Sequence, residues 1–191
     1  MGRGERAAVS GQEAVLADEI PSAIGTIVLA ARARRLCALD YADCRERFLA
    51  LLRARYEDAV LRFAPDPFGF SSRIRSYLAG ELAAIENIPV ETKGTRFQER
   101  VWTALRRIPP GATLTYAEVA RGIGRPLAAR AVGGVNRRNP VAIVVPCHRV
   151  IGTDSSLTGY AGGLWRKRWL LSHEENWTRT SSPSRVANRG A

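Results

Sequence analysis

The chain has 191 residues, of which 46% are hydrophobic and 25% charged, and its formal net charge is +11. These values fit one globular domain or two small ones, and no apolar run reaches the roughly eighteen residues that a membrane span requires. The surplus of arginine favours a polyanionic partner such as nucleic acid, although an arginine-rich proteome would give the same charge.

The N-terminus and the cysteines indicate where the protein works. The N-terminus lacks the apolar core of a secretory signal. Three cysteines, an odd number, argue against a disulfide framework and for a reducing interior. We therefore expect a cytoplasmic protein with no contact with a membrane.

The first half of the chain predicts a small α/β domain over residues 14–88, preceded by a disordered extension over residues 1–13. Apolar and branched side chains over 24–29 and 36–39 predict two strands, with an arginine-rich turn at 32–35. The expected fold of this half is a small antiparallel sheet with helices.

Helical spacing of apolar residues predicts a helix over 45–63, which the prolines of segment 65–67 would end. Ser72 is expected to cap a second helix. Cys37 and Cys44 have no histidine near them in the sequence, which favours two buried or idle thiols over a metal site.

The second half predicts a mainly α-helical domain over residues 95–177, joined by a linker at 87–95 that contains a proline and a glycine. Thr95 and Gln98 have the spacing of a capping box. They predict a helix that runs to about Arg107.

Two short helices follow. Thr115 and Glu118 have the spacing of a second capping box, which begins a helix over 116–121. A glycine-containing turn leads to a basic helix over 127–138. This arrangement is typical of a helix-turn-helix, and with the net charge it favours DNA binding over an ordinary helix pair with a solvated arginine face.

Cys147 lies at an interruption of an apolar run. The branched residues 143–145 predict a buried extended segment, which Pro146 would end. A neighbouring imidazole, here His148, together with Arg149 is the surrounding that lowers a thiol pKa and creates a nucleophile. On the dipeptide alone, a small buried cysteine beside a structural histidine is the commoner arrangement.

A glycine-containing loop is predicted over 152–163. Its glycines would let the backbone approach a ligand closely, or the loop is a plain turn. A last helix is expected from Leu164 to about Trp177, followed by a disordered basic tail over 178–191. Glu174 on this helix is a candidate to orient His148 in a Cys–His–Glu relay. Three side chains of the helix are expected to face inward: Trp165, Trp169 and Leu170.

Several motifs of the second half occur in order. They are Arg130-Ala131-Val132-Gly133-Gly134, Asn139-Pro140, Pro146-Cys147-His148-Arg149-Val150, Gly159-Tyr160-Ala161-Gly162-Gly163 and Leu170-Leu171-Ser172-His173-Glu174. Together they resemble the O6-alkylguanine-DNA alkyltransferases over roughly residues 95–175, with the Pro-Cys-His-Arg-Val stretch as the active-site signature. The resemblance is weaker over 14–87, where segment 21–25 resembles a common opening of the family's N-terminal α/β domain.

The resemblance assigns the chemistry residue by residue. It implies that Cys147 takes the alkyl group from guanine O6 irreversibly, in a single turnover. His148, through a water, and Glu174 would keep the thiolate available, and Asn139 would hold the cysteine segment in place. No cofactor is implied, because the protein itself is the acceptor.

The same resemblance implies a substrate site. Tyr116 would donate to guanine N3, and the carbonyls of Cys147 and Val150 would accept from the exocyclic amine. Tyr160 and the Ala161 N–H would line the pocket near O6. Some relatives have serine where this chain has Ala161, so only a backbone donor is expected there.

The implied partner is double-stranded DNA that carries O6-alkylguanine, with O4-alkylthymine as a further substrate left open. The O6 alkyl group is hidden in the duplex, so the nucleotide must leave the stack, and Arg130 would take its place. The protein is expected to act as a monomer. The sequence has no Cys/His set for the structural zinc that some relatives carry.

Two other functions compete with DNA repair. One is a helix-turn-helix regulator in which Cys147 is an alkylation or redox switch. The other is a hydrolase that uses Cys147, His148 and Glu174 on a thioester or peptide, which would leave the basic helix and Tyr116 unexplained.

Overall fold

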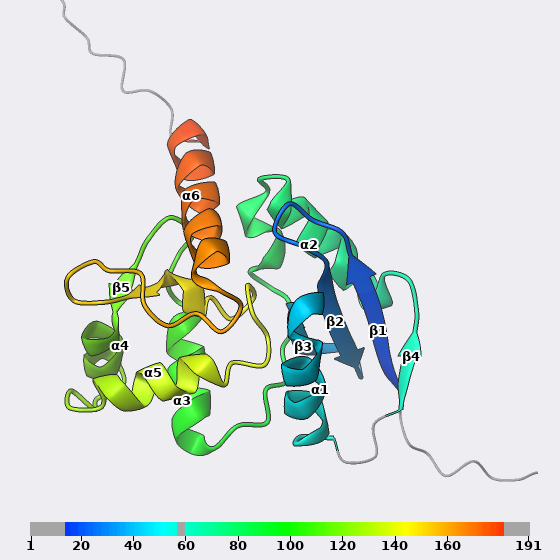
Figure 1. Ribbon diagram of the computed structural model, residues 1–191, viewed down its shortest axis with the longest axis horizontal. Helices are drawn as coiled ribbons and strands as arrows, with labels where there is room; N and C mark the ends of the chain where they lie inside the picture. The colour runs from blue at the N-terminus through cyan, green and yellow to red at the C-terminus, as the bar shows by residue number, and fades with distance from the viewer. Residues whose placement is uncertain (1–13, 57–59, 182–191) are drawn as a thin grey trace, which may run out of the picture.

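The computed structural model describes residues 14–56 and 60–181, and Figure 1 shows an N-terminal sheet beside a mainly helical C-terminal part. The strands are β1 Val15–Ile20, β2 Ile27–Arg32, β3 Arg35–Tyr41, β4 Leu61–Phe63, β5 Leu114–Thr115 and β6 Val150–Ile151. The α-helices are α1 Arg45–Arg53, α2 Phe70–Leu78, α3 Arg96–Leu105, α4 Tyr116–Gly122, α5 Ala129–Arg137 and α6 Leu164–Ser181. Short 3₁₀ helices are Ala42–Cys44, Pro67–Gly69, Leu82–Ile85 and Cys147–Arg149.

The N-terminal sheet has the strand order β3-β2-β1-β4. β2 and β3, the two predicted strands, pair antiparallel, and β1 also pairs antiparallel with β2, but β4 pairs parallel with β1, so the sheet is mixed. The predicted antiparallel pairing holds for three strands, and β4 departs from it because it follows the crossover helix α1, the connection that brings a strand back in the parallel sense. β1 itself was not predicted.

Two helix predictions in this part are wrong in their bounds. The helix expected over 45–63 ends at Arg53, and residues 61–63 form the edge strand β4. Ser72 is inside α2, whose N-cap is Gly69. The backbone N–H and the hydroxyl of Ser72 both donate to the Asp66 carboxylate, so Ser72 does not cap the helix.

The C-terminal part follows the predicted helix order. Both capping boxes form, Thr95 with Gln98 and Thr115 with Glu118, because each needs only residues three apart. The pair α4 and α5 is joined by a tight turn in which Arg125 N–H bonds to the Ala120 carbonyl. α6 runs to Ser181, past its predicted end, while the predicted extension over 1–13 and the tail from residue 182 lie outside the described residues.

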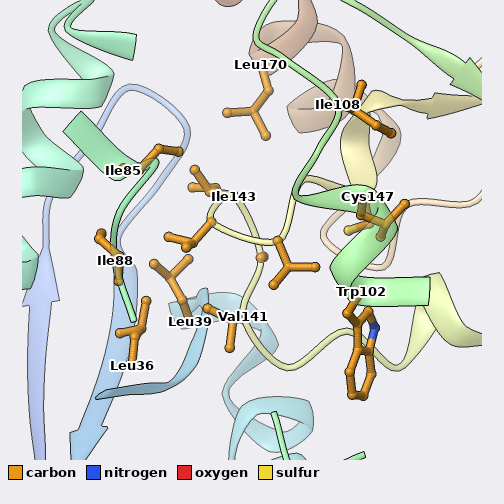
Figure 2. Close-up of a cluster of buried hydrophobic side chains, with 14 of the residues drawn as sticks. Leu36, Leu39, Ile85, Ile88, Trp102, Ile108, Val141, Ile143, Cys147 and Leu170 are labelled. Atoms are coloured by element: carbon orange, nitrogen blue, oxygen red, sulfur yellow. The ribbon is translucent and has the colours of Figure 1, made fainter. Parts of the chain in front are cut away.

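One hydrophobic core joins the two parts. Figure 2 shows Leu36 and Leu39 of β3 beside Val141 and Ile143 of the C-terminal part, with Cys147 in the same cluster. Backbone bonds seal the joint. Leu36 N–H donates to the Pro89 carbonyl, so the predicted linker at 87–95 packs against β3.

The residues of α6 that face inward differ from those that were predicted. Leu170 is buried as expected, but Trp165 is 51% exposed and Trp169 only half-buried. Arg166 and Lys167 occupy the inner positions instead, and their charged groups donate hydrogen bonds to buried backbone carbonyls.

No helix among the described residues is long and apolar enough to cross a membrane.

Candidate active site

The segment before Cys147 is wound rather than extended. Val145 N–H bonds to the Val141 carbonyl and Val144 N–H to the Ala142 carbonyl, with Ile143 at φ +68°. The predicted extended run over 143–145 is therefore wrong. A branched residue at positive φ is strained, and the surrounding core and the pairing of this segment with β3 hold it in place.

Asn139 ties this segment together. Its Nδ2 donates to the Val145 carbonyl at 2.7 Å and to the Cys147 Sγ at 3.2 Å, while its Oδ1 accepts from Val141 N–H at 3.0 Å. Because Asn139 is buried, all three bonds are shielded from water. The side chain thus fixes the position of the sulfur.

His148 and Glu174 form the predicted pair. His148 Nε2 lies 2.9 Å from Glu174 Oε1, and both side chains are fully buried. Glu174 also accepts from Arg149 Nη2 and Tyr77 Oη, both at 2.7 Å, and from Gly111 N–H at 3.2 Å. Four residues from three segments of the chain, around 77, 111 and 148–149, therefore meet at this one carboxylate.

The surroundings of Glu174 and His148 determine the charge that each side chain carries. Burial alone would raise the pKa of Glu174, but bonds from His148 and Arg149 hold that pKa well below its usual range. Burial lowers the pKa of His148, against the raising effect of Glu174. At neutral pH, Glu174 is therefore ionised and His148 neutral.

Cys147 is a protonated thiol in its resting state. Burial raises the pKa of this thiol, and the Asn139 hydrogen bond and the charge of Lys167 offset part of the rise. The sequence led us to expect a lowered pKa, because it could not show that the residue is only 6% exposed. The thiol needs a base before it can act as a nucleophile.

A cavity of about 690 Å³ lies between the two parts of the chain. It is lined by four of the predicted substrate residues, Tyr116, Arg130, Tyr160 and Ala161, and by Arg47, Gly133, Gly134, Arg137, Arg138 and Gly159. Burial raises the pKa of both tyrosines, and a negative charge on Cys147 would raise both further. The volume lies within the range of small-molecule sites, and the arginines make the mouth positive.

Val150 lies in β6, outside the set of residues that line the cavity. Its carbonyl accepts from Lys167 Nζ at 2.6 Å, and the same ammonium donates to the Thr158 carbonyl at 2.8 Å. A carbonyl has two lone pairs, so the Val150 oxygen has capacity for a second donor. Tyr116 Oη also donates to the Thr158 carbonyl, at 3.3 Å.

Three residues near the site were not predicted from the sequence: Lys167, Arg47 and Tyr77. Lys167 lies three residues before Leu170 and seven before Glu174, so a lysine on the inner stripe of α6 was a usable signal. Arg47 and Tyr77 carried none, because α1 and α2 reach the site only through the packing of the two parts.

Cys37 lies in the N-terminal cluster with Val15 and Phe48, whereas the Cys44 Sγ lies 4.0 Å from the carbonyl of Ala161, which lines the cavity. Cys37 is buried and Cys44 half-buried, and both are free thiols, as predicted. Within 14–56 and 60–181, no group of three or more His, Cys, Asp or Glu side chains is placed to hold a metal ion.

Comparison with known proteins gives one consistent family. Residues 96–176, from α3 into α6, match the family described as 6-O-methylguanine DNA methyltransferase, DNA binding domain. The methylated-DNA–protein-cysteine methyltransferase of Shigella flexneri is 45% identical over 163 residues, which cover 84% of this chain and 95% of that relative. The one from Mycobacterium bovis is 49% identical over 131 residues, 67% of this chain and 79% of the relative.

A solved structure agrees with the sequence relatives. The crystal structure of Mycobacterium tuberculosis OGT in complex with DNA superposes with a TM-score of 0.73 at 41% identity, covering 85% of this chain and 94% of that one. The match extends over both parts of the fold, including the N-terminal sheet, where the sequence resemblance is weaker. The chain therefore belongs to the family of the methylated-DNA–protein-cysteine methyltransferases.

Proposed function

We propose that the protein repairs O6-alkylguanine in double-stranded DNA by moving the alkyl group to Cys147, once and irreversibly. The Cys147 sulfur forms a bond to the alkyl carbon as the bond from that carbon to guanine O6 breaks. The guanine leaves with the electron pair and takes up a proton. The observation that carries this proposal is a buried thiol that is bonded to Asn139 and followed by His148, which pairs with Glu174, in a fold that also forms an arginine-lined cavity.

His148 is the proposed base. Its Nε2 is hydrogen-bonded to the Glu174 carboxylate. This bond selects the tautomer with the proton on Nε2 and the lone pair on Nδ1. Nδ1 makes no hydrogen bond to any described residue. A water between Nδ1 and Sγ would carry the thiol proton to the imidazole, and the Glu174 carboxylate would then stabilise the imidazolium against the opposing charge of Arg149.

The leaving guanine needs donors and acceptors on its edge. Tyr116 keeps its proton because burial raises its pKa, so it would donate to N3 as charge develops on the base. The carbonyls of Cys147 and Val150 would accept from the exocyclic amine. The Ala161 N–H and Tyr160 line the cavity on the side proposed for O6.

Flipping of the nucleotide is assigned to α5. Arg130 is exposed near the start of this helix and lines the cavity, with Arg137 and Arg138 further along it. Small residues such as Gly133 and Gly134 let the helix lie close to a groove of DNA. An inserted Arg130 would offset the few kcal/mol that unstacking costs, and the other arginines would bind phosphates.

The proposal includes the setting of the reaction. Residues 14–88 and 95–177 are proposed as two domains that share the core around Cys147. Three free cysteines fit the reducing cytoplasm, and we propose that the protein acts there as a monomer. Alkyl transfer to the protein's own sulfur uses no cofactor.

Transfer from labelled DNA tests the proposal. Duplex DNA with radiolabelled O6-methylguanine should pass its label to the protein, up to one methyl per molecule, and Cys147→Ala should abolish the transfer. Catalytic turnover beyond one methyl, or undiminished labelling of Cys147→Ala, would contradict it. Tight binding to an undamaged promoter sequence without transfer would favour the regulator instead.

A further inference from the structure

One wall of the cavity is held by a side chain from the N-terminal part. The hydroxyls of Tyr41, the last residue of β3, and Tyr160 lie 3.0 Å apart. Tyr41 is fully buried and Tyr160 only 9% exposed. Their rings meet edge to face, with centroids 6.5 Å apart and planes at 64°, a favourable arrangement for an aromatic pair.

Arg166 fixes the Tyr41 ring from α6. Its guanidinium lies 4.1 Å from the ring centroid of Tyr41. The same group donates to the carbonyls of Gly162 and Ile24 and to the Asp43 carboxylate, each at 2.8 Å. Tyr41 is thus packed against a cation that bonds to the cavity loop and to the N-terminal part at once.

The loop itself is shaped around Tyr41. A Cβ added at Gly162 would lie 2.4 Å from the Tyr41 ring, so only glycine lets the ring pack directly on the loop backbone. Gly163 N–H donates to the Tyr160 carbonyl at 3.0 Å and closes the turn. Residues 160–163 cannot move outward without breaking the contacts to Tyr41.

We propose that Tyr41 is a positioning residue that limits the size of the alkyl group the cavity accepts. The inference rests on the proposed function, in which Tyr160 lies beside the alkylated O6. With the hydroxyl pair intact, the Tyr160 ring stays in place and the space beside O6 suits a small alkyl group. A bulky group requires the ring to move, and that movement breaks the bond to Tyr41.

The test compares two lesions in the same duplex, O6-methylguanine and O6-benzylguanine. Tyr41→Phe keeps the ring and removes the hydroxyl. We expect the rate of benzyl transfer relative to methyl transfer to rise about fivefold, which corresponds to about 1 kcal/mol at 1.4 kcal/mol per factor of ten and is the net strength of one hydrogen bond. An unchanged ratio, or a fall, would overturn the inference.

Tyr160→Phe removes the same bond from the other side. If the two hydroxyls act through each other, the double variant should show the ratio of a single variant rather than the product of both. Multiplied effects would show that the residues act separately and would contradict the inference. Should Tyr41→Phe fold poorly, the ratio for Tyr160→Phe decides alone, with no rise counting against the inference.

Tyr56→Phe is the matched control, since Tyr56 is another buried tyrosine of the N-terminal part, in a separate cluster with Val15 and Phe48. Its ratio should equal that of the unaltered chain, and a rise equal to that of Tyr41→Phe would count against a specific role of Tyr41. Absence of methyl transfer by the unaltered chain would instead refute the proposed function itself. The two failures are therefore distinguishable.

Discussion

His148 Nε2 lies 2.9 Å from Glu174 Oε1 in a region where neither side chain is exposed. Arg149 bonds to the same carboxylate at 2.7 Å, so Glu174 both orients the imidazole and neutralises a buried guanidinium. A single carboxylate thereby links the proposed chemistry to the stability of the fold.

Glu174→Gln should therefore destabilise the protein strongly. The substitution leaves the Arg149 charge buried without its counterion, an effect that costs about 3–5 kcal/mol of unfolding free energy in comparable pairs. Denaturant unfolding measures it. Glu175→Gln, which changes the exposed neighbour on α6, should shift the unfolding free energy by less than about 0.5 kcal/mol, and equal midpoints for the two variants would contradict the account.

Stability should fall as the solution is acidified from neutrality. The pKa of His148 is lowered in the folded state, so below its ordinary value of about 6.5 the unfolded chain binds a proton that the folded chain does not. The pKa of Glu174 is also lowered, and its contribution, complete above about pH 4.5, is lost below that value. The denaturation midpoint should decline from pH 7 to 5 and more steeply below 4.5, whereas a flat or rising midpoint between pH 7 and 5 would count against a buried neutral imidazole.

Asn139→Ala should impair the thiol more than the rest of the fold. The Asn139 hydrogen bond to Sγ lowers the pKa of Cys147, and the substitution removes that bond. It also removes the bonds to Val145 and Val141. We expect methyl transfer about tenfold slower and an unfolding free energy lower by about 1–3 kcal/mol. The pH dependence of alkylation of Cys147 by a small reagent should shift to higher pH, and an unshifted profile would exclude the proposed role of Asn139.

Arg130→Ala should separate duplex repair from chemistry. Without a side chain to fill the stack, transfer from O6-methylguanine in a duplex should fall about 10- to 100-fold, the equivalent of about 1.4–2.7 kcal/mol. Transfer from the free base should stay within about twofold, since no flipping is needed. Arg62→Ala, on the edge strand β4 away from α5 (Figure 1), should leave both rates unchanged, and equal losses on both substrates would argue against flipping by Arg130.

Local patterns predicted the elements that depend on local contacts. The capping boxes at Thr95 and Thr115 form as expected, since both partners lie within one helical turn. The segment before Cys147 was predicted as extended because its branched residues fit a strand, but the side chain of Asn139 and the pairing with β3 wind it instead. Such tertiary effects override local propensity.

The site shows the same limit. The proposed nucleophile, its histidine and the proposed substrate residues come from a family signature that carries them in order, and their roles stay predictions. The contact between Tyr41 and Tyr160 joins residues 119 positions apart, and no spacing in the sequence indicates it. The position of Lys167 could have been predicted, because its spacing from Leu170 and Glu174 places a cation on the inner face of the helix.

The most direct measurement is mass spectrometry of the protein after incubation with a duplex oligonucleotide that carries O6-methylguanine. The three cysteines provide their own controls, because Cys37 and Cys44 are free thiols in the same chain. The account predicts one added methyl group, confined to the peptide that contains Cys147, and unmodified guanine restored in the DNA. An unmodified Cys147 with the lesion intact, or a methyl group on Cys37 or Cys44 instead, would contradict it.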